Sequence, residues 1–355
     1  MRKKTRNSII VAAIAVIIIA LVCGCDYYRT FYRDNVSPQD EGAVVVKVYH
    51  NFSYDDLCRV MEESGALQSI RTFRRAARFM DLTDGFKAGA YSIRRGMNNK
   101  ALVRMFANGW QTPVKVSFSG YIRSLERFSA ILGEKFEADS ASFATVLTDT
   151  AVMSKYGFEK ESFIGMFIPN TYEFYWTVSP EAFVERMNKE YLAFWNESRQ
   201  KKADDIGLDR KQVSTLASIV ISETKYEPEM ARVAGVYMNR LHKGILLQAD
   251  PTVIFACNQF GIQRVLNSHL KIDSPYNTYI HKGLPPGPIT MSPIVAIDAV
   301  LNYERHNYIF FCARETFDGQ HNFASTLSGH MANARAYHKA LTALQKKKKS
   351  EAGEK

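Results

Sequence analysis

Residues 217–228 are ASIVISETKYEP, a stretch that puts a carboxylate at the end of an apolar stripe. If this stretch is helical, the apolar residues at positions 216, 219 and 220 share one face with Glu223. Two interpretations fit this spacing. Glu223 is either a solvated residue at a frayed helix end, paired with Lys225 or Arg240, or a carboxyl whose pKa is raised by apolar neighbours, as a general acid requires. Spacing alone does not choose between them.

The surrounding sequence predicts a helical hairpin. DRKQVSTLASIVISETK (209–225) has the helical period, and Pro228 separates it from EMARVAGVYMNRLHKG (229–244). In the second segment, Met230, Val233, Ala234, Tyr237 and Leu241 recur at helical spacing, and Gly244 is the expected C-cap. Glu223 would then lie near the turn between two helices.

Length, composition and charge indicate a folded protein that does not bind nucleic acid. A chain of 355 residues with 46% hydrophobic residues can form one large or two ordinary domains. The net charge is +10, but the head at Arg2, Lys3, Lys4 and Arg6 supplies +4 and residues 346–355 supply +3. Because little basic excess remains for the folded body, a basic patch for nucleic acid is not expected.

The N-terminal segment predicts export. Residues 9–22, IIVAAIAVIIIALV, are uninterrupted apolar letters close to the minimum length for a membrane span. The basic residues before them place the N-terminus in the cytoplasm and the rest of the chain outside. We favour an uncleaved single-pass anchor, while a lipid anchor on Cys25 and a cleaved signal peptide remain alternatives.

Metal and cofactor chemistry are not indicated. Three of five cysteines, Cys58, Cys257 and Cys312, lie in the exported body without CxxC spacing, and the eight histidines show no ligand spacing. The sequence also lacks a P-loop, a dinucleotide fingerprint and GxSxG. We therefore expect neither a metal nor a cofactor.

The chain is predicted to be α+β, with a small domain before a larger one. Residues 26–42 suggest a juxtamembrane linker. VVVKVY (44–49) and AYSIRR (90–95) suit strands, with helices at 54–67, 72–81 and 99–109. VKVSFS, from residue 114, opens the next region as another strand. A basic tail after residue 343 is expected to be disordered.

Two further stretches could carry polar side chains to a site. In LLQADPTVIFA (246–256), Asp250 before Pro251 is predicted to be a helix N-cap, and the amide of Gln248 could bind a sugar or sit at the surface. SPYNTYIHKGLPPGPITMSP (274–293) suggests a rigid loop whose Tyr276, Asn277 and Tyr279 bind a polar ligand or pack on the core.

A third stretch, GMFIPNTYEFYW (165–176), holds five aromatic residues in twelve positions. Aromatic faces line many carbohydrate grooves, yet a buried strand has the same composition. The core interpretation is favoured.

In order and spacing, several stretches resemble the YceG-like endolytic murein transglycosylases. They are LASIVISET (216–224), VAGVYMNRL (233–241), LLQADPTVIFA, SPYNTYIHKGLPPGPI and HNFASTLSGH (321–330). FIPNTY (167–172) is similar to the family's FPDTY element, and FKAGAYSIRRGMNNKALVRMFANG (86–109) resembles the end of its small LysM-like domain. With the N-terminal anchor, the resemblance covers most of the chain.

The resemblance implies that Glu223 is catalytic, because it matches the second acid of the family's EKET motif, whose first acid is replaced here by Ile221. As an acid, Glu223 would protonate the glycosidic oxygen. As a carboxylate, it would then take the proton of the muramic C6 hydroxyl, which attacks C1 and closes a 1,6-anhydro ring. A glycosidase of the usual kind needs a second carboxylate, whereas here the nucleophile belongs to the substrate.

The same resemblance suggests which residues position the sugars. We expect Gln248, Tyr276, Asn277 and Tyr279 to bind substrate, with Asn239 and Arg240 as weaker candidates. Departures from the family limit the transfer: Asn170 and Ser119 stand where the family has acids. His321 and His330 match a C-terminal pattern and are expected to be structural or at the rim of the site.

These expectations define the domains. They are a basic head and transmembrane anchor (1–30), a linker (31–43), a LysM-like domain (44–112), a mixed α+β catalytic domain (113–343) and a disordered basic tail (344–355).

The predicted function follows from the resemblance. It is a lyase that cleaves nascent peptidoglycan between N-acetylmuramic acid and N-acetylglucosamine on the periplasmic side of the inner membrane, with a role in ending glycan elongation. Peptidoglycan synthases are the expected protein partners. The alternative functions are a noncatalytic peptidoglycan-binding scaffold and an ordinary muramidase that uses water.

Overall fold

The computed structural model describes residues 2–37, 42–118, 121–262 and 265–353. The chain divides into two compact units. The first contains Met1–Val116, Lys135–Glu137 and Tyr172–Val178, and the second contains the remaining residues. Both units combine helices with short strands, so the predicted mixed α+β class is confirmed.

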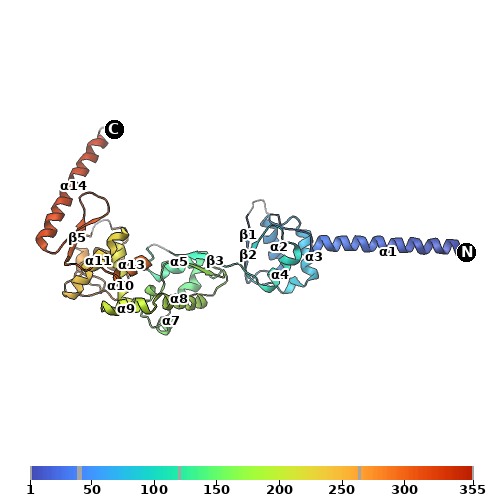
Figure 1. Cartoon of the computed structure of the whole chain (residues 1–355), viewed down its shortest axis with the longest axis horizontal. Coiled ribbons are helices and arrows are strands. Elements are labelled where there is room, and N and C mark those ends of the chain that lie inside the picture. The colour runs from blue at the N-terminus through green and yellow to red at the C-terminus, as the bar shows by residue number, and fades with distance from the viewer. Residues whose placement is uncertain (1, 38–41, 119–120, 263–264, 354–355) are drawn as a thin grey trace. The chain divides into compact units, whose positions relative to one another are not determined.

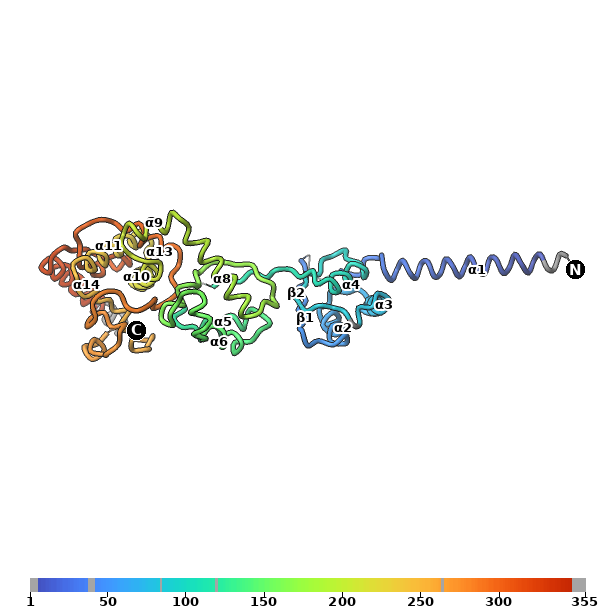
Figure 2. Tube along the Cα trace, turned by 90° about the horizontal axis from the view of Figure 1, so that it is seen from below, coloured from blue at the N-terminus to red at the C-terminus, as the bar shows by residue number. Residues whose placement is uncertain are grey.

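The first helix, α1 (Arg2–Phe31), includes a segment long and apolar enough to cross a membrane. Between Arg6 and Phe31 its mean hydropathy reaches 3.0, and its apolar side chains from Ile9 to Val22 are exposed. In Figures 1 and 2 this helix projects from α3 and α4 of the first unit. A membrane span and a signal sequence share these properties.

The residues after α1 belong to the core of the first unit, which corrects the expected linker for residues 31–37. Phe31 and Val36 are buried in the same apolar cluster as the helices that follow. Asn35 is also buried, and its side-chain amide donates to Oδ1 of Asn99 at 2.7 Å and to the carbonyl of Ser69 at 2.9 Å. Residues 38–41, also assigned to the linker, lie outside the described residues.

The first unit is a two-stranded sheet covered by short helices. β1 (Val44–Val48) and β2 (Gly89–Ile93) are antiparallel, with Val44 opposite Ile93. Between them lie α2 (Tyr54–Glu63), α3 (Ile70–Phe79) and the 3₁₀ turn η1 (Leu82–Asp84), and α4 (Asn99–Asn108) follows. These elements match the predicted strands and helices. The helices begin at side-chain caps Ser53, Ser69 and Asn98, which satisfy otherwise unpaired backbone N–H groups.

The middle of the chain pairs two short strands and adds a layer of helices. β3 (Val114–Ser117) pairs with β4 (Thr171–Phe174), which confirms the strand expected from residue 114. The other elements of this region are α5 (Leu125–Lys135), α6 (Ser140–Leu147), α7 (Thr150–Lys155), η2 (Phe163–Met166), α8 (Pro180–Phe194) and α9 (Glu197–Asp205).

The aromatic stretch 165–176 packs in the interior. Phe167 is fully buried, and its ring contacts Phe128 and Phe163 with ring centroids 5.0 and 5.2 Å apart. The same stretch also buries Trp176. The core interpretation of this stretch is confirmed.

The C-terminal part of the second unit is built around a helical hairpin. α10 (Arg210–Glu223) and α11 (Glu227–His242) form the hairpin, and α13 (Ile294–Leu301) packs on both. α12 (Asp250–Ala256) and η3 (His269–Lys271) lie in the connection between α11 and α13, followed by the antiparallel pair β5 (Phe310–Ala313) and β6 (His321–Ala324).

Residues up to Gly353 are helical, although the tail from residue 344 was expected to be disordered. α14 (Leu327–Gly353) packs against β5 and β6, and Figure 1 shows it extending from β5 toward the C-terminus. The sequence between residues 339 and 349 has high helix propensity, because it is rich in alanine, leucine, glutamine and lysine. This explains why the basic tail continues the helix.

Candidate active site

Glu223 is the last residue of α10, close to the predicted turn. α10 begins with a capping box in which Asp209 and Gln212 bond each other's backbone N–H groups. It ends because Thr224 takes an extended conformation (φ −136°, ψ 137°), and Pro228 sits in the first turn of α11, where a missing N–H costs nothing. The face of α10 before Glu223 is buried, so the apolar stripe carries this carboxyl to the edge of the core.

Tyr237 holds the Glu223 carboxyl from the neighbouring helix. Its hydroxyl donates to Oε1 of Glu223 at 2.7 Å. Burial raises the pKa of Glu223 to about 7, because an ionised carboxylate loses its hydration there. The Tyr237 hydrogen bond and Arg240 oppose this shift in pKa, while the nearby charge of Asp250 adds to it. A carboxyl with this pKa can give and take a proton near neutral pH.

Asp250 is a second carboxylate in the site, not the helix cap that the sequence suggests. The N-cap of α12 is Ala249, and Asp250 is the first helical residue with no capping hydrogen bond. Its Oδ1 instead accepts a hydrogen bond from the hydroxyl of Tyr279. Burial, followed by the contact with Asp250, raises the pKa of Tyr279 well above its usual range. The cap prediction is therefore wrong.

Arg240 ties the loop after α11 to the strand β5. Its Nη1 donates to the carbonyls of Leu246 and Leu247 at 3.0 Å and to Oε1 of Gln248 at 3.1 Å, and its Nε donates to the carbonyl of Ile309 at 2.7 Å. Burial lowers the pKa of Arg240. With four acceptors inside the protein, this guanidinium positions the wall of the site.

Gln248 is held in an unusual backbone conformation beside this arginine. Its φ is +52°, in the left-handed region that side chains other than glycine seldom adopt. The N–H of Gln248 donates to the carbonyl of Thr278 at 3.0 Å, which couples the loop to the segment that carries Tyr279. The Gln248 side chain is exposed, and because Arg240 holds its Oε1, the NH₂ group is the part that can bond a ligand.

These side chains line one cavity of about 510 Å³. Of the predicted residues, the cavity brings together Glu223, Arg240, Gln248 and Tyr279. Its other lining residues come from α11, α12, β5, β6, α14 and the 246–250 loop, and they are Tyr237, Leu247, Asp250, Phe310, Phe311, Cys312, Ala313, His321, Leu327, His330 and Met331.

A second hollow, of about 470 Å³, adjoins the first at Glu223. Both are lined by Glu223, Ala313 and His321, and the second continues to Tyr121, Lys225, Arg314 and Phe317 among others. Because the two hollows share the proposed acid, a long ligand could extend on both sides of Glu223.

Three predicted ligand residues do not line either hollow. Asn277 is fully buried, and its side-chain amide donates to the carbonyls of Leu270 and Ile272 at 3.0 and 2.8 Å. Its Oδ1 accepts from the N–H of Tyr279 at 3.0 Å. All three bonds are internal, so Asn277 shapes the loop that carries Tyr279 and lines neither hollow.

Tyr276 and Asn239 are likewise engaged elsewhere. The Tyr276 ring packs on Phe255, with centroids 4.7 Å apart. Asn239 donates to the carbonyls of His306 and Tyr308 at 2.7 and 2.9 Å. Asn239 anchors the segment before β5, and neither residue reaches the cavity.

His321 and His330 line the cavity. His321 is bonded to the buried carboxylate of Glu229, as described below. The His330 ring stacks on Phe310 with centroids 5.1 Å apart, and burial lowers the pKa of His330. The expected structural or rim role of these histidines stays a prediction.

Sequence reasoning missed Tyr237, Asp250 and Glu229. Tyr237 fits the apolar stripe of its helix, and only its place 14 residues after Glu223, on the facing helix, could have suggested the contact. Asp250 looks like a cap because proline follows it. Glu229 gives no local signal, since its partner lies 92 residues away.

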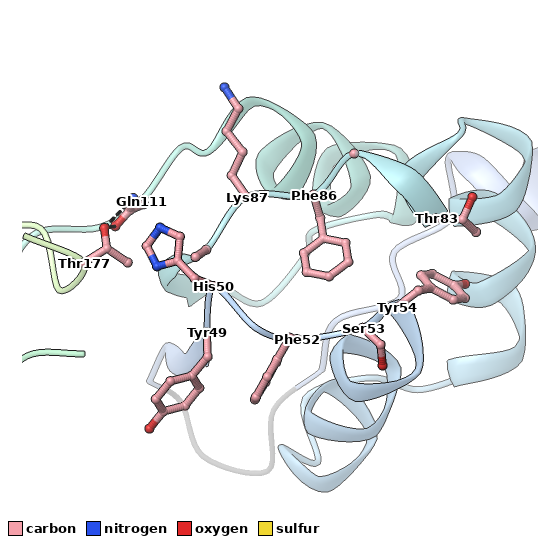
Figure 3. Close-up of a pocket in the computed structure, with 12 residues that line it drawn as sticks. Tyr49, His50, Phe52, Ser53, Tyr54, Thr83, Phe86, Lys87, Gln111 and Thr177 are labelled. Carbon is pink, nitrogen blue, oxygen red and sulfur yellow. Dashed lines mark hydrogen bonds between the residues drawn. The ribbon is translucent and has the colours of Figure 1, made fainter. Parts of the chain in front are cut away.

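The first unit contains a separate hollow of about 600 Å³. It lies between the segment after β1 and the segment before β2. Figure 3 shows the rings of Tyr49, Phe52, Tyr54 and Phe86 along it, with His50 and Gln111 near one end. Such a wall could stack on sugar rings. Within the described parts of both units, no three histidine, cysteine or acidic residues cluster as metal ligands.

Comparisons with known proteins agree with this architecture. The model of the YceG-like family matches residues 46–336. An endolytic murein transglycosylase of Bacillus subtilis (strain 168) is 24% identical over 330 residues, covering 87% of this chain and 89% of that protein. One of Streptococcus pneumoniae (strain D39) is 24% identical over 356 residues and covers 89% of this chain, which spans 63% of that longer relative.

The comparison with solved structures points the same way. A crystal structure of a YceG-like protein from Listeria monocytogenes has a TM-score of 0.56 and 25% identity. The match covers 82% of this chain and 99% of that one.

Proposed function

Because the chain belongs to the YceG-like family, we propose that it is a peptidoglycan lytic transglycosylase with Glu223 as its general acid and base. The observation that carries this proposal is the Glu223 carboxyl, whose pKa is raised to about 7 where two hollows meet. Protonated, it can serve as an acid toward a glycosidic oxygen. After proton transfer, it can serve as the base for the next step.

The reaction we propose balances without water. Glu223 gives its proton to the oxygen that links muramic acid C1 to the next sugar, and that C1–O bond breaks. The C6 hydroxyl of the same muramic acid then attacks C1 while Glu223 takes the hydroxyl proton. The products are a 1,6-anhydromuramyl end and a new sugar hydroxyl, and Glu223 is again protonated.

Side chains around Glu223 support this chemistry in different ways. Tyr237 holds the carboxyl, while Gln248 and Tyr279, which line the same cavity, would contact the sugars. Arg240, which we include among the site residues, holds the 246–248 loop in place. The charge of Asp250 favours the protonated form of Glu223 and so favours the acid step.

We also propose where and on what the enzyme acts. The basic residues before the apolar helix would keep the N-terminus in the cytoplasm and place both units on the outer side of the inner membrane. The first unit would be a LysM-like domain that holds glycan on its aromatic hollow. Nascent strands beside peptidoglycan synthases would be the substrate, and cleavage would end their elongation.

The test is digestion of purified glycan strands followed by mass analysis of the products. Anhydromuramyl ends support the proposal, reducing ends would indicate an ordinary muramidase, and intact strands would indicate a noncatalytic scaffold. Glu223→Gln should abolish cleavage, because the amide can neither give nor take the proton. Glu227→Gln is the matched control, since Glu227 is exposed on the next turn and lines neither hollow.

A further inference from the structure

Glu229 and His321 form a buried polar pair that the reaction above does not use. Oε2 of Glu229 lies 3.0 Å from Nδ1 of His321, and Oε1 accepts the backbone N–H of the same histidine at 3.0 Å. The Glu229 side chain is only 4% exposed, and the His321 side chain 14%. One carboxylate thus fixes both the backbone and the ring of His321.

Burying an ionised carboxylate is costly unless neighbouring groups stabilise its charge. Glu229 lies in the first turn of α11, where the N-terminal end of the helix dipole stabilises negative charge. Both of its oxygens accept hydrogen bonds from His321. An ionised carboxylate can only accept, so the bridging proton belongs to Nδ1 of the ring.

This arrangement determines what the other ring nitrogen offers. In the neutral ring, a proton on Nδ1 leaves Nε2 with a lone pair, which can accept a hydrogen bond. His321 lines both hollows that meet at Glu223. The ring is further fixed by Phe311, whose plane is perpendicular to it at a centroid distance of 5.3 Å.

We propose that Nε2 of His321 accepts a hydrogen bond from a hydroxyl or amide N–H of the sugar bound next to Glu223. Glu229 is the positioning residue that keeps Nε2 in its accepting form. The inference rests on the proposed glycan-cleaving function and deepens it, because it assigns a second sugar contact to the wall that both hollows share.

Two substitutions of His321 separate a sugar contact from a structural role. His321→Asn keeps an amide near the position of Nδ1, where it can still donate to Glu229, but removes the Nε2 acceptor. His321→Gln reaches toward the position of Nε2 but gives up the geometry at Nδ1. A sugar contact predicts that H321N lowers kcat/KM by about fivefold or more, the size of one lost hydrogen bond, and that H321Q loses less.

Glu229→Gln tests the positioning role. The glutamine amide can still accept from the His321 backbone, but its NH₂ would donate to Nδ1 and move the ring proton to Nε2. Nε2 would then be a donor, so kcat/KM should fall while the melting temperature of the full chain stays close to that of the wild type. His338→Asn, on the exposed side of α14, is the control that should keep wild-type kinetics.

The measurements use the full chain in detergent with purified glycan strands, and the wild type is assayed first. If the wild type does not cleave, the proposed function fails. If it cleaves and H321N is as active as the wild type, or H321Q is worse than H321N, the sugar contact is refuted while the function stands.

If the His321 variants unfold, the contact can be tested with His321 in place. In the E223Q protein labelled with ¹⁵N in its imidazole rings, added glycan strands should shift the Nε2 resonance of His321. An unchanged resonance at saturating glycan would overturn the proposal.

Discussion

The hydroxyl of Tyr237 donates a 2.7 Å hydrogen bond to Oε1 of Glu223, which joins two facing helices at the proposed acid. This bond and the burial of Glu223 act in opposite directions. Burial favours the protonated carboxyl, whereas a hydrogen-bond donor favours the carboxylate. The pKa of about 7 is the balance of these effects with the charges of Asp250 and Arg240.

Tyr237→Phe should move the alkaline limb of the pH–activity profile to higher pH. Removing the donor destabilises the carboxylate, so the pKa of Glu223 rises and the acid form persists further into the alkaline range. One hydrogen bond corresponds to a shift of about half a unit to one unit. The measurement is kcat/KM against pH, which reports on the free enzyme. If the limb moves to lower pH, the Tyr237 hydrogen bond does not lower the pKa of Glu223.

Asp250→Asn should move the same limb in the opposite direction. The charge of Asp250 raises the pKa of Glu223, so a neutral amide at this position lets Glu223 ionise at lower pH. Tyr279→Phe is the matched control, because it removes the hydroxyl bound to Asp250 and leaves the carboxylate in place. If D250N and Y279F give the same profile, the charge of Asp250 does not act on Glu223.

Regular periodicity made the scaffold of the site predictable. The apolar stripe of 209–225 gave the helix α10, and Pro228 marked the turn after Glu223. The strands and helices of the first unit were also predicted from local sequence patterns. Each of these signals acts within a few residues of the chain, which is why sequence reasoning could use them.

Polar contacts between distant segments were not predictable. Whether an amide such as Asn277 meets a ligand or two backbone carbonyls depends on the fold of residues 270–279, which composition does not specify. The hydrogen bonds of Arg240 reach partners that lie between 6 and 69 positions away in the sequence. Residues 31–37 were mistaken for a linker for the same reason. Their sequence is polar and aromatic, and nothing in it reveals that Asn35 bonds the buried Asn99, 64 positions away.

Gln248→Asn and Asn277→Ala should separate ligand contact from loop support. Asparagine tolerates the left-handed backbone of Gln248 but is too short to keep the amide in place. We expect Q248N to raise KM severalfold with little change in melting temperature. N277A leaves two part-buried carbonyls without donors, at up to about 1–3 kcal/mol for each, so it should destabilise the fold. If N277A is as stable as the wild type but has a raised KM, Asn277 contacts the sugar and does not only support the loop.

Glu223→Gln should stabilise the protein at alkaline pH. Folding raises the pKa of Glu223 from its ordinary 4.5 to about 7, so the folded state binds the proton more tightly than the unfolded chain does. The resulting stability is fully present below pH 4.5 and is lost as the pH rises through 7. Glutamine is neutral at every pH and avoids this loss.

The free energy of unfolding of E223Q should therefore match that of the wild type near pH 4 and exceed it near pH 8, by at most about 3 kcal/mol. Denaturant titrations of both proteins at the two pH values measure the difference, with E227Q as the exposed control from the next turn. A gap that is the same at both pH values would mean that folding does not shift the pKa of Glu223. Burial would then not raise the pKa of Glu223, and the carboxyl would have to act as an acid with its ordinary pKa.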